Sequence, residues 1–116
     1  MLRSQFFTQT QVEAILRDYR TAGLAPAEVA LMAFAEKVAL HAHKVTQQDI
    51  DGLRSHRFSD AEILDIAMTA AARSFFSKVL DAVGAEPDER YRELEQGLRQ
   101  TLTVGRPFGK DAPKTP

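Results

Sequence analysis

The stretch SDAEILDIAMTAAARSFFSKVLDAVG, residues 59–84, decides the fold that this sequence predicts. Ser59 and Glu62 have the spacing of a capping box, in which a hydroxyl and a carboxylate satisfy the free backbone amides at a helix start. Gly84 stands where a residue in the left-handed conformation would end the helix. We therefore expect one helix of roughly 24 residues, which corresponds to a length of about 36 Å.

This long helix is apolar on nearly all of its surface. A helix of that kind has to be surrounded, and the other helices of a 116-residue chain are too short to surround it. We therefore expect a homo-oligomer, formed through the face of the helix at residues 59–83 that carries Met68, Phe75 and Phe76. The strongest apolar face of this helix contains Leu64, Met68, Ala71, Ala72, Phe75, Val79 and Ala82.

Three shorter helices are predicted before the long one. The first covers about residues 10–22 and begins at Thr10 and Glu13, which have capping-box spacing. The second begins at a proline, which suits the first helical position, and covers residues 26–40 with a wide apolar surface. The third is short and covers residues 46–56, with a threonine as its cap.

A fifth helix is predicted after the long one, followed by a tail. Pro87 opens this helix, and a narrow apolar seam runs along it as far as Leu102. Residues 103–116 are rich in Gly, Pro and Lys, which indicates a flexible C-terminal tail. No strand pattern and no linker interrupt residues 1–102, so we expect a single domain there. The fold class is all-α, a compact bundle of four to five helices completed by oligomerisation.

Composition restricts the function of these residues. Lys and Arg number 15 and Asp and Glu 16, for a formal net charge of −1, so neither nucleic acid nor an anionic membrane is an expected partner. The chain contains no cysteine, which excludes thiolate nucleophiles, disulfides and thiolate metal sites. Residues 1–10 lack a signal-peptide pattern, and no apolar stretch is long enough to span a bilayer. We expect a cytoplasmic protein.

Four polar residues are the candidates for chemistry, with no cofactor and no metal site predicted. Glu36 lies among apolar neighbours in mid-helix, where burial would raise its pKa and make it a general base. His41 and His43 are two residues apart, so on a regular helix they point about 200° from each other and cannot share an ion. Arg73 belongs to a polar strip with Asp65, which it could reach past an intervening threonine, and is a candidate anion anchor. The alternatives are a solvent-exposed or paired Glu36, two histidines closing a helix, and a solvated or intersubunit face at Arg73.

Two segments together resemble a known family. DYRTAGLAPAEVALMAFAEKVA (residues 18–39) looks like a helix pair with LxxFAEK at its heart. KVTQQDIDGLRSHRFSDAEILDIAMTAAARSFFSKVLDAVGAEPD (residues 44–88) looks like a VTxxDIxxLRxxGFSDxEIL element followed by a long helix ending in LxxxLGxEPD. The chain thereby resembles the C-terminal half of peroxidase-related enzymes in the alkylhydroperoxidase D-like, carboxymuconolactone decarboxylase-like superfamily. The resemblance runs from Ile15 to Asp88 and covers roughly 70 of the 116 residues.

The departures from that family change what the resemblance implies. Its active members reduce peroxides with a CxxC helix assisted by a glutamate and a histidine, and this chain has no cysteine. The CxxC-bearing region is expected to be missing, because only residues 1–14 precede the matching part. Ser77 and Lys78 stand where the family often shows an Asn-Arg pair. The surface that the missing half would cover should instead be covered by another copy or another chain.

Three functions follow as expectations. The first is a cysteine-less alkylhydroperoxidase D-like protein that acts as a non-catalytic oligomeric or partner-binding module. The second is an acid–base enzyme of the carboxymuconolactone decarboxylase type, with Glu36 as base, His41 or His43 as proton shuttle and Arg73 as anion anchor; it requires a pocket where at least two of them converge. The third is a separately encoded half of a heteromeric peroxidase, completed by a CxxC-bearing partner chain.

Overall fold

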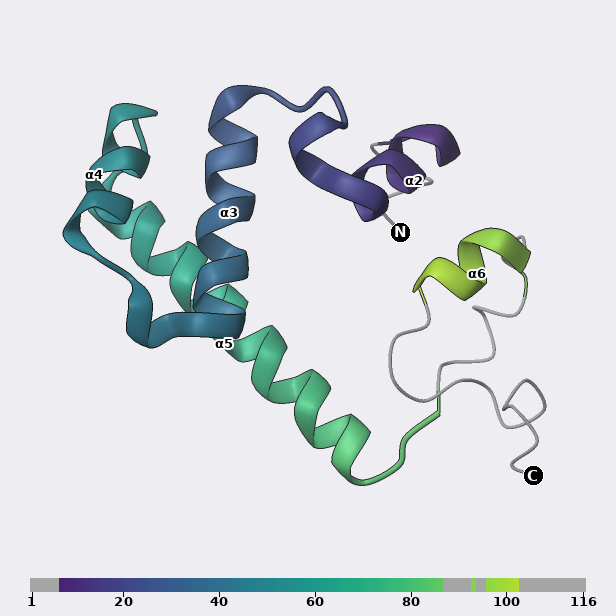
Figure 1. The fold of residues 1–116 in the computed structure, drawn as a ribbon. Helices are drawn as coiled ribbons and strands as arrows, with labels where there is room; N and C mark the ends of the chain where they lie inside the picture. The colour runs from purple at the N-terminus through teal and green to yellow at the C-terminus, as the bar shows by residue number, and fades with distance from the viewer. Residues whose placement is uncertain (1–6, 87–92, 94–95, 103–116) are drawn as a thin grey trace. The chain divides into compact units, whose positions relative to one another are not determined.

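The computed structural model describes residues 7–86, 93 and 96–102, and this part of the chain is helical without any strand. The predicted all-α class is confirmed. The order of elements along the chain is shown in Figure 1. The helices are α2 (Gln9–Asp18), η1 (Tyr19–Thr21), α3 (Pro26–His41), η2 (Ala42–Lys44), α4 (Gln47–Ser55), α5 (Asp60–Ala82) and α6 (Gln96–Leu102), where η marks a short 3₁₀ helix.

The chain divides into two units, residues 1–76 and residues 77–116, with α5 contributing to both. The first unit contains α2, α3, α4 and the larger part of α5, and the second contains the end of α5 and α6. The expectation of a single domain over residues 1–102 stays a prediction.

Capping signals set the starts of α4 and α5 as the sequence predicts. At α5, the Ser59 amide donates to Glu62 Oε1 at 3.0 Å, and the Glu62 amide donates to Ser59 Oγ at 3.1 Å. At α4, Thr46 and Asp49 form the same reciprocal pair. The predicted terminating residue Gly84 has φ +75°, in the left-handed region that glycine adopts without a steric penalty.

The predicted cap of the first helix is wrong. Thr8, not Thr10, caps α2, and its partner three residues later is Gln11 rather than Glu13. Two overlapping pairs here have capping-box spacing, Thr8 with Gln11 and Thr10 with Glu13. The sequence signal therefore fits both positions. The helix also ends earlier than predicted, because Asp18 accepts the Arg20 amide and the chain tightens into η1.

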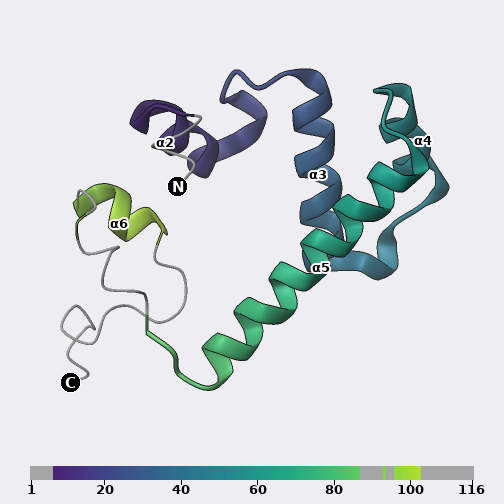
Figure 2. The same ribbon diagram turned by 180° about the vertical axis from the view of Figure 1, so that it is seen from behind.

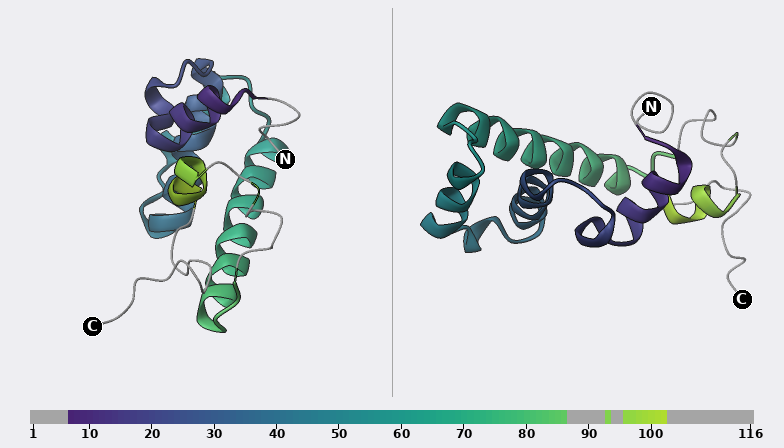
Figure 3. Two further views of the ribbon diagram at one scale, coloured as in Figure 1. Left: turned by 90° about the vertical axis from the view of Figure 1, so that its right-hand side faces the viewer. Right: turned by 90° about the horizontal axis from the view of Figure 1, so that it is seen from above.

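The core of the first unit consists of three buried side chains from three helices. Phe34 of α3, Leu53 of α4 and Ile63 of α5 are 6%, 2% and 5% exposed. Figures 2 and 3 show α3 and α4 together on one side of α5. Half-buried side chains surround this core: Ala30, Val38, Val45, Ile50, Phe58, Ile66 and Ala67.

Ion pairs between successive helices surround this small core. Lys37 Nζ of α3 lies 2.7 Å from Asp49 Oδ2 of α4. Arg54 Nε of α4 lies 2.8 Å from Asp60 Oδ1 at the start of α5. Each pair joins elements that are adjacent in sequence, so together they hold the angles at which α3, α4 and α5 meet.

The predicted fifth helix is described only in part. α6 lies within its predicted range, with Leu98 buried and Leu102 40% exposed. The predicted opening at Pro87 and the predicted tail at residues 103–116 lie outside the described residues.

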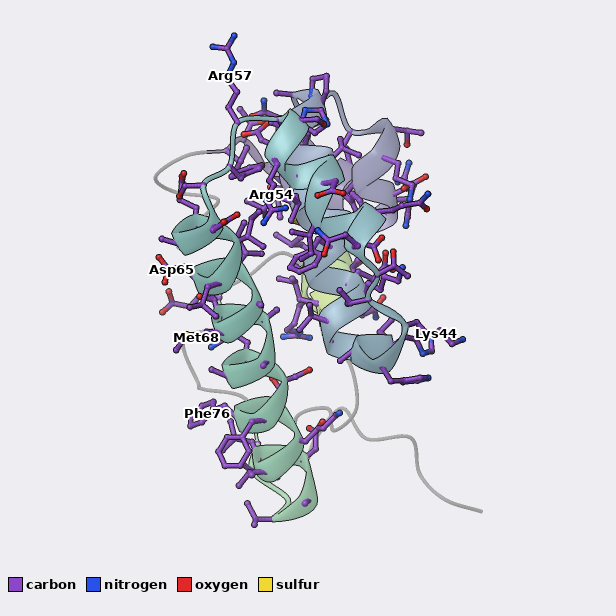
Figure 4. All side chains as sticks on the ribbon, turned by 90° about the vertical axis from the view of Figure 1, so that its left-hand side faces the viewer. Lys44, Arg54, Arg57, Asp65, Met68 and Phe76 are labelled. Carbon is purple, nitrogen blue, oxygen red and sulfur yellow. The ribbon has the colours of Figure 1, made fainter. Side chains whose placement is uncertain are left out.

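The turn between α4 and α5 contains a non-glycine residue in the left-handed conformation. Arg57 has φ +70°, and its exposed side chain points away from the helices in Figure 4. The family pattern quoted above has glycine at this position. A residue with a Cβ atom costs about 1–2 kcal/mol in this conformation, because the Cβ approaches the following carbonyl oxygen.

Arg57→Gly is therefore expected to stabilise the fold. The gain in the free energy of unfolding should be about 0.5–1 kcal/mol, since the greater chain entropy of unfolded glycine offsets part of the relief. Urea unfolding at one protein concentration measures it. Arg57→Ala is the control, because it removes the same side chain and keeps the Cβ. A glycine variant no more stable than the alanine variant would contradict the argument.

Candidate functional site

The spacing of residues along α5 gives the helix a side that packs on the core, a polar side and an exposed apolar side. At 3.6 residues per turn, Ile63, Ile66 and Ala67 share the side that packs on α3 and α4. Asp65, Thr69 and Arg73 form an exposed polar strip on a second side. The third side is apolar and is the candidate functional site.

We define the apolar face of α5 as Leu64, Met68, Phe75, Phe76 and Val79, of which Phe76 lies at the border with the polar strip, two turns beyond Thr69. These side chains are 58%, 60%, 69%, 55% and 43% exposed. In Figure 4, Met68 and Phe76 lie on the side of α5 turned away from α3 and α4. Leu80 and Val83 add further exposed apolar surface at the C-terminal end of the helix.

This exposure has a thermodynamic cost. Fully burying a large apolar side chain is worth about 1.5–3 kcal/mol relative to leaving it in water. Soluble monomers rarely expose a contiguous apolar patch larger than a few hundred Å² unless it binds something. The sequence predicted Met68, Phe75 and Phe76 at an interface, and the structure leaves all three exposed in the isolated chain, as such an interface requires.

Of the two interpretations of Glu36, the structure shows the solvent-exposed, paired carboxylate and not the buried base. Its side chain is 44% exposed and accepts hydrogen bonds from Tyr19 Oη at 2.7 Å and from Arg20 Nη2 at 2.9 Å. The hydrogen bond from Tyr19, followed by that from Arg20, lowers the pKa of Glu36. A carboxylate held in its charged form by two donors is a poor proton acceptor, so Glu36 ties η1 to α3 instead.

The two histidines lie where α3 ends. His41 is the last residue of α3 and leaves the helical conformation at φ −146°, and His43 follows in η2. Because the chain departs from a regular helix here, their rings come within 6.3 Å, centroid to centroid, in an edge-to-face arrangement. Both side chains are exposed. Among the residues that the structure describes, no group of three or more His, Asp and Glu is placed to hold a metal ion.

Arg73 is exposed on the polar strip of α5. In the described part of the chain, no hydrogen bond or ion pair joins Arg73 to Asp65, so the contact that their spacing suggested is not formed. Of the four candidates for chemistry, only the two histidines touch each other within the described residues. The arrangement therefore lacks the convergence that the acid–base hypothesis requires.

A cavity of about 260 Å³ lies between α3 and α4, and none of the four candidates lines it. Its wall includes the core residues Phe34 and Leu53, Asp49 and Gly52 of α4, and His56, which follows α4 directly. Asp49 is already engaged, since it accepts from Lys37 Nζ at 2.7 Å and from the Thr46 amide at 2.7 Å. The cavity is thus a groove between two helices. Asp49 is the one carboxylate in its lining, and it already accepts hydrogen bonds from Lys37 and Thr46.

Asp49 has a second role that the sequence reasoning missed. Besides capping α4 it pairs with Lys37, a cation that the sequence places in mid-helix among apolar residues. The hydrogen bond from Lys37, followed by that from the Thr46 backbone, lowers the pKa of Asp49. A lysine in mid-helix signals that a carboxylate partner is needed, but it does not say which carboxylate supplies it.

Comparisons of the chain with protein-family models, with curated proteins and with solved structures found no match. The resemblance to the alkylhydroperoxidase D-like superfamily therefore stays a prediction. No helix in the described ranges combines the length and the apolar character needed to cross a membrane.

Asp49→Asn is expected to lower stability in a pH-dependent way. Folding lowers the pKa of the Asp49 carboxyl below 3.8, its value in the unfolded chain. The charged carboxylate therefore stabilises the native state at pH values above 3.8, and this contribution is lost as the pH falls through the lower pKa of the folded state. The variant should be less stable than the parent chain at pH 7, and the difference should narrow below about pH 4. Urea unfolding between pH 7 and pH 3 measures this.

Asp65→Asn is the matched control, because Asp65 is exposed on α5 and has no ion pair among the described residues. Equal pH dependence of the two variants would show that the contact with Lys37 and Thr46 contributes nothing to stability.

Proposed function

We propose that this chain is a cysteine-less, alkylhydroperoxidase D-like helical protein that acts as a non-catalytic module by associating with copies of itself. The proposal combines the family resemblance of residues 15–88 with the apolar face of α5. The observation that carries it is the exposure of five large apolar side chains along a single helix.

The other residues support association rather than chemistry. No thiol is present in these 116 residues, so the peroxide-reducing chemistry of the family has no nucleophile here. The carboxylate of Glu36 is held charged by Tyr19 and Arg20 and serves as a link between η1 and α3. The apolar face, in contrast, has no structural role within the described part of the chain.

A small core gives association a second benefit. Three buried side chains hold α3, α4 and α5 together. Covering the apolar face of α5 from outside would add buried apolar area to a helix that forms one wall of that core, at roughly 25 cal/mol per Å². Association would therefore stabilise the subunit as well as the assembly.

Light scattering at micromolar concentration is expected to show a dimer or a larger species. Phe75→Glu should shift the protein to monomers, because a charge placed in a desolvated interface has no partner. The expected loss is about 3 kcal/mol or more, which is over a hundredfold in the dissociation constant.

Ser77→Glu is the control, since it places the same charge on the same helix at an exposed position that points about 160° away from Phe75. Helical circular dichroism of both variants checks that they remain folded. A parent chain that is monomeric throughout the micromolar range would contradict self-association. So would recovery of the chain only in a complex with a cysteine-containing protein, which is the outcome that the heteromeric peroxidase would give.

A further inference from the structure

We propose that the occupant of the apolar face is the same face of a second copy, with the two α5 helices antiparallel and crossing between Ala71 and Ala72. This inference rests on the proposed self-association and adds its geometry. It follows from the spacing of residues along α5, from the charge of its two halves and from the area exposed.

Six exposed apolar residues of α5 are spaced symmetrically about one point, a pattern to which Phe76, Leu80 and Val83 do not belong. Leu64, Met68 and Ala71 precede that point at the same intervals at which Ala72, Phe75 and Val79 follow it. A two-fold axis through this point would place Met68 level with the partner's Phe75 and Leu64 level with the partner's Val79. An isologous interface requires this kind of self-complementary surface.

The residue sizes along the face suit a helix crossing. The two alanines lie at the centre, where small side chains let the helix axes approach closely, and large side chains lie on both sides of them. Met68 would meet an aromatic ring of the partner, a favourable contact for a thioether sulfur. A parallel pair would instead set the two copies of Phe75 side by side and the two copies of Met68 side by side.

The charges of α5 also favour the antiparallel orientation. Asp60, Glu62 and Asp65 make the first half of the helix acidic, whereas Arg73 and Lys78 lie in the second half, with Asp81 near the end. An antiparallel pair sets each acidic half beside a half that carries the cations, and it opposes the two helix dipoles. A parallel pair would set the two acidic halves against each other.

The exposed area is sufficient for a dimer contact. Large apolar side chains offer on the order of 100 Å² each when they are about half exposed, so the five residues of the apolar face supply roughly 500 Å². Somewhat more than half of a typical interface is non-polar, so this is about the apolar area that one partner contributes. A standard interface takes about 800 Å² from each partner. One copy of the face is thus the right size to be covered by another.

Cross-linking between introduced cysteines tests the orientation of the two helices. The chain has no cysteine of its own, so the reagent reacts only at the introduced positions. Ala61 and Ala82 are both exposed and lie at the two ends of the apolar side of α5. They are 21 residues apart, about 32 Å along the helix, so a bismaleimide reagent of about 10 Å cannot join them within one copy. The double variant Ala61→Cys/Ala82→Cys is cross-linked, and the linked peptides are identified by mass spectrometry.

The expected product joins position 61 of one copy to position 82 of the other, and adding Phe75→Glu should abolish it. Gln48→Cys, exposed on α4, measures cross-linking by random collision. Links of 61 to 61 and 82 to 82 would overturn the antiparallel arrangement while the proposed self-association stands. An oligomer without links between α5 helices would place the interface elsewhere and also overturn it. A monomer by light scattering would refute the proposed function itself.

Discussion

The contact among Phe34, Leu53 and Ile63 is the constraint on which the rest of the first unit depends. These three side chains come from α3, α4 and α5, and they are the buried apolar residues of that unit. By turning Ile63 inward, the contact sets the rotation of α5 about its own axis. Once that rotation is set, Leu64, Met68 and Phe75 face away from the core, because a helix that buries one side must present the others.

The polar contacts around this core act as local ties. Asp49 joins the cap of α4 to Lys37, Arg54 joins α4 to Asp60, and Glu36 joins α3 to Tyr19. Each is at least partly exposed to solvent, so each contributes modestly to stability. These contacts restrict geometry more than they add stability. Charge-assisted hydrogen bonds depend on direction, so they restrict the angle between adjacent helices, which a core of three side chains restricts only in part. Of the four residues that were candidates for chemistry in the sequence, Glu36 is used in this way.

The sequence predicted helix starts and ends well where one signal stood alone. Thr46 with Asp49 and Ser59 with Glu62 are the observed caps, and Gly84 has the expected positive φ. The prediction failed at Thr10, where an overlapping pair offered the same chemistry two residues earlier. At Glu36 the sequence left a buried base and an exposed, paired carboxylate open, because the neighbours along the chain are apolar. Neighbours in sequence point to all sides of a helix, and Glu36 points to the exposed one.

The sequence by itself determined that the described residues are helical, where the long helix begins and ends, and that apolar side chains lie on nearly all sides of this helix. Those properties depend on local spacing, capping and composition, which need no knowledge of distant contacts. Only the tertiary structure decided which apolar side of α5 is buried. The strongest face by sequence contains Leu64, Met68 and Phe75, yet the side with Ile63 packs on α3 and α4. A helix that is apolar nearly all round has no periodicity that singles out one side, so the choice depends on the shapes and positions of the neighbouring helices.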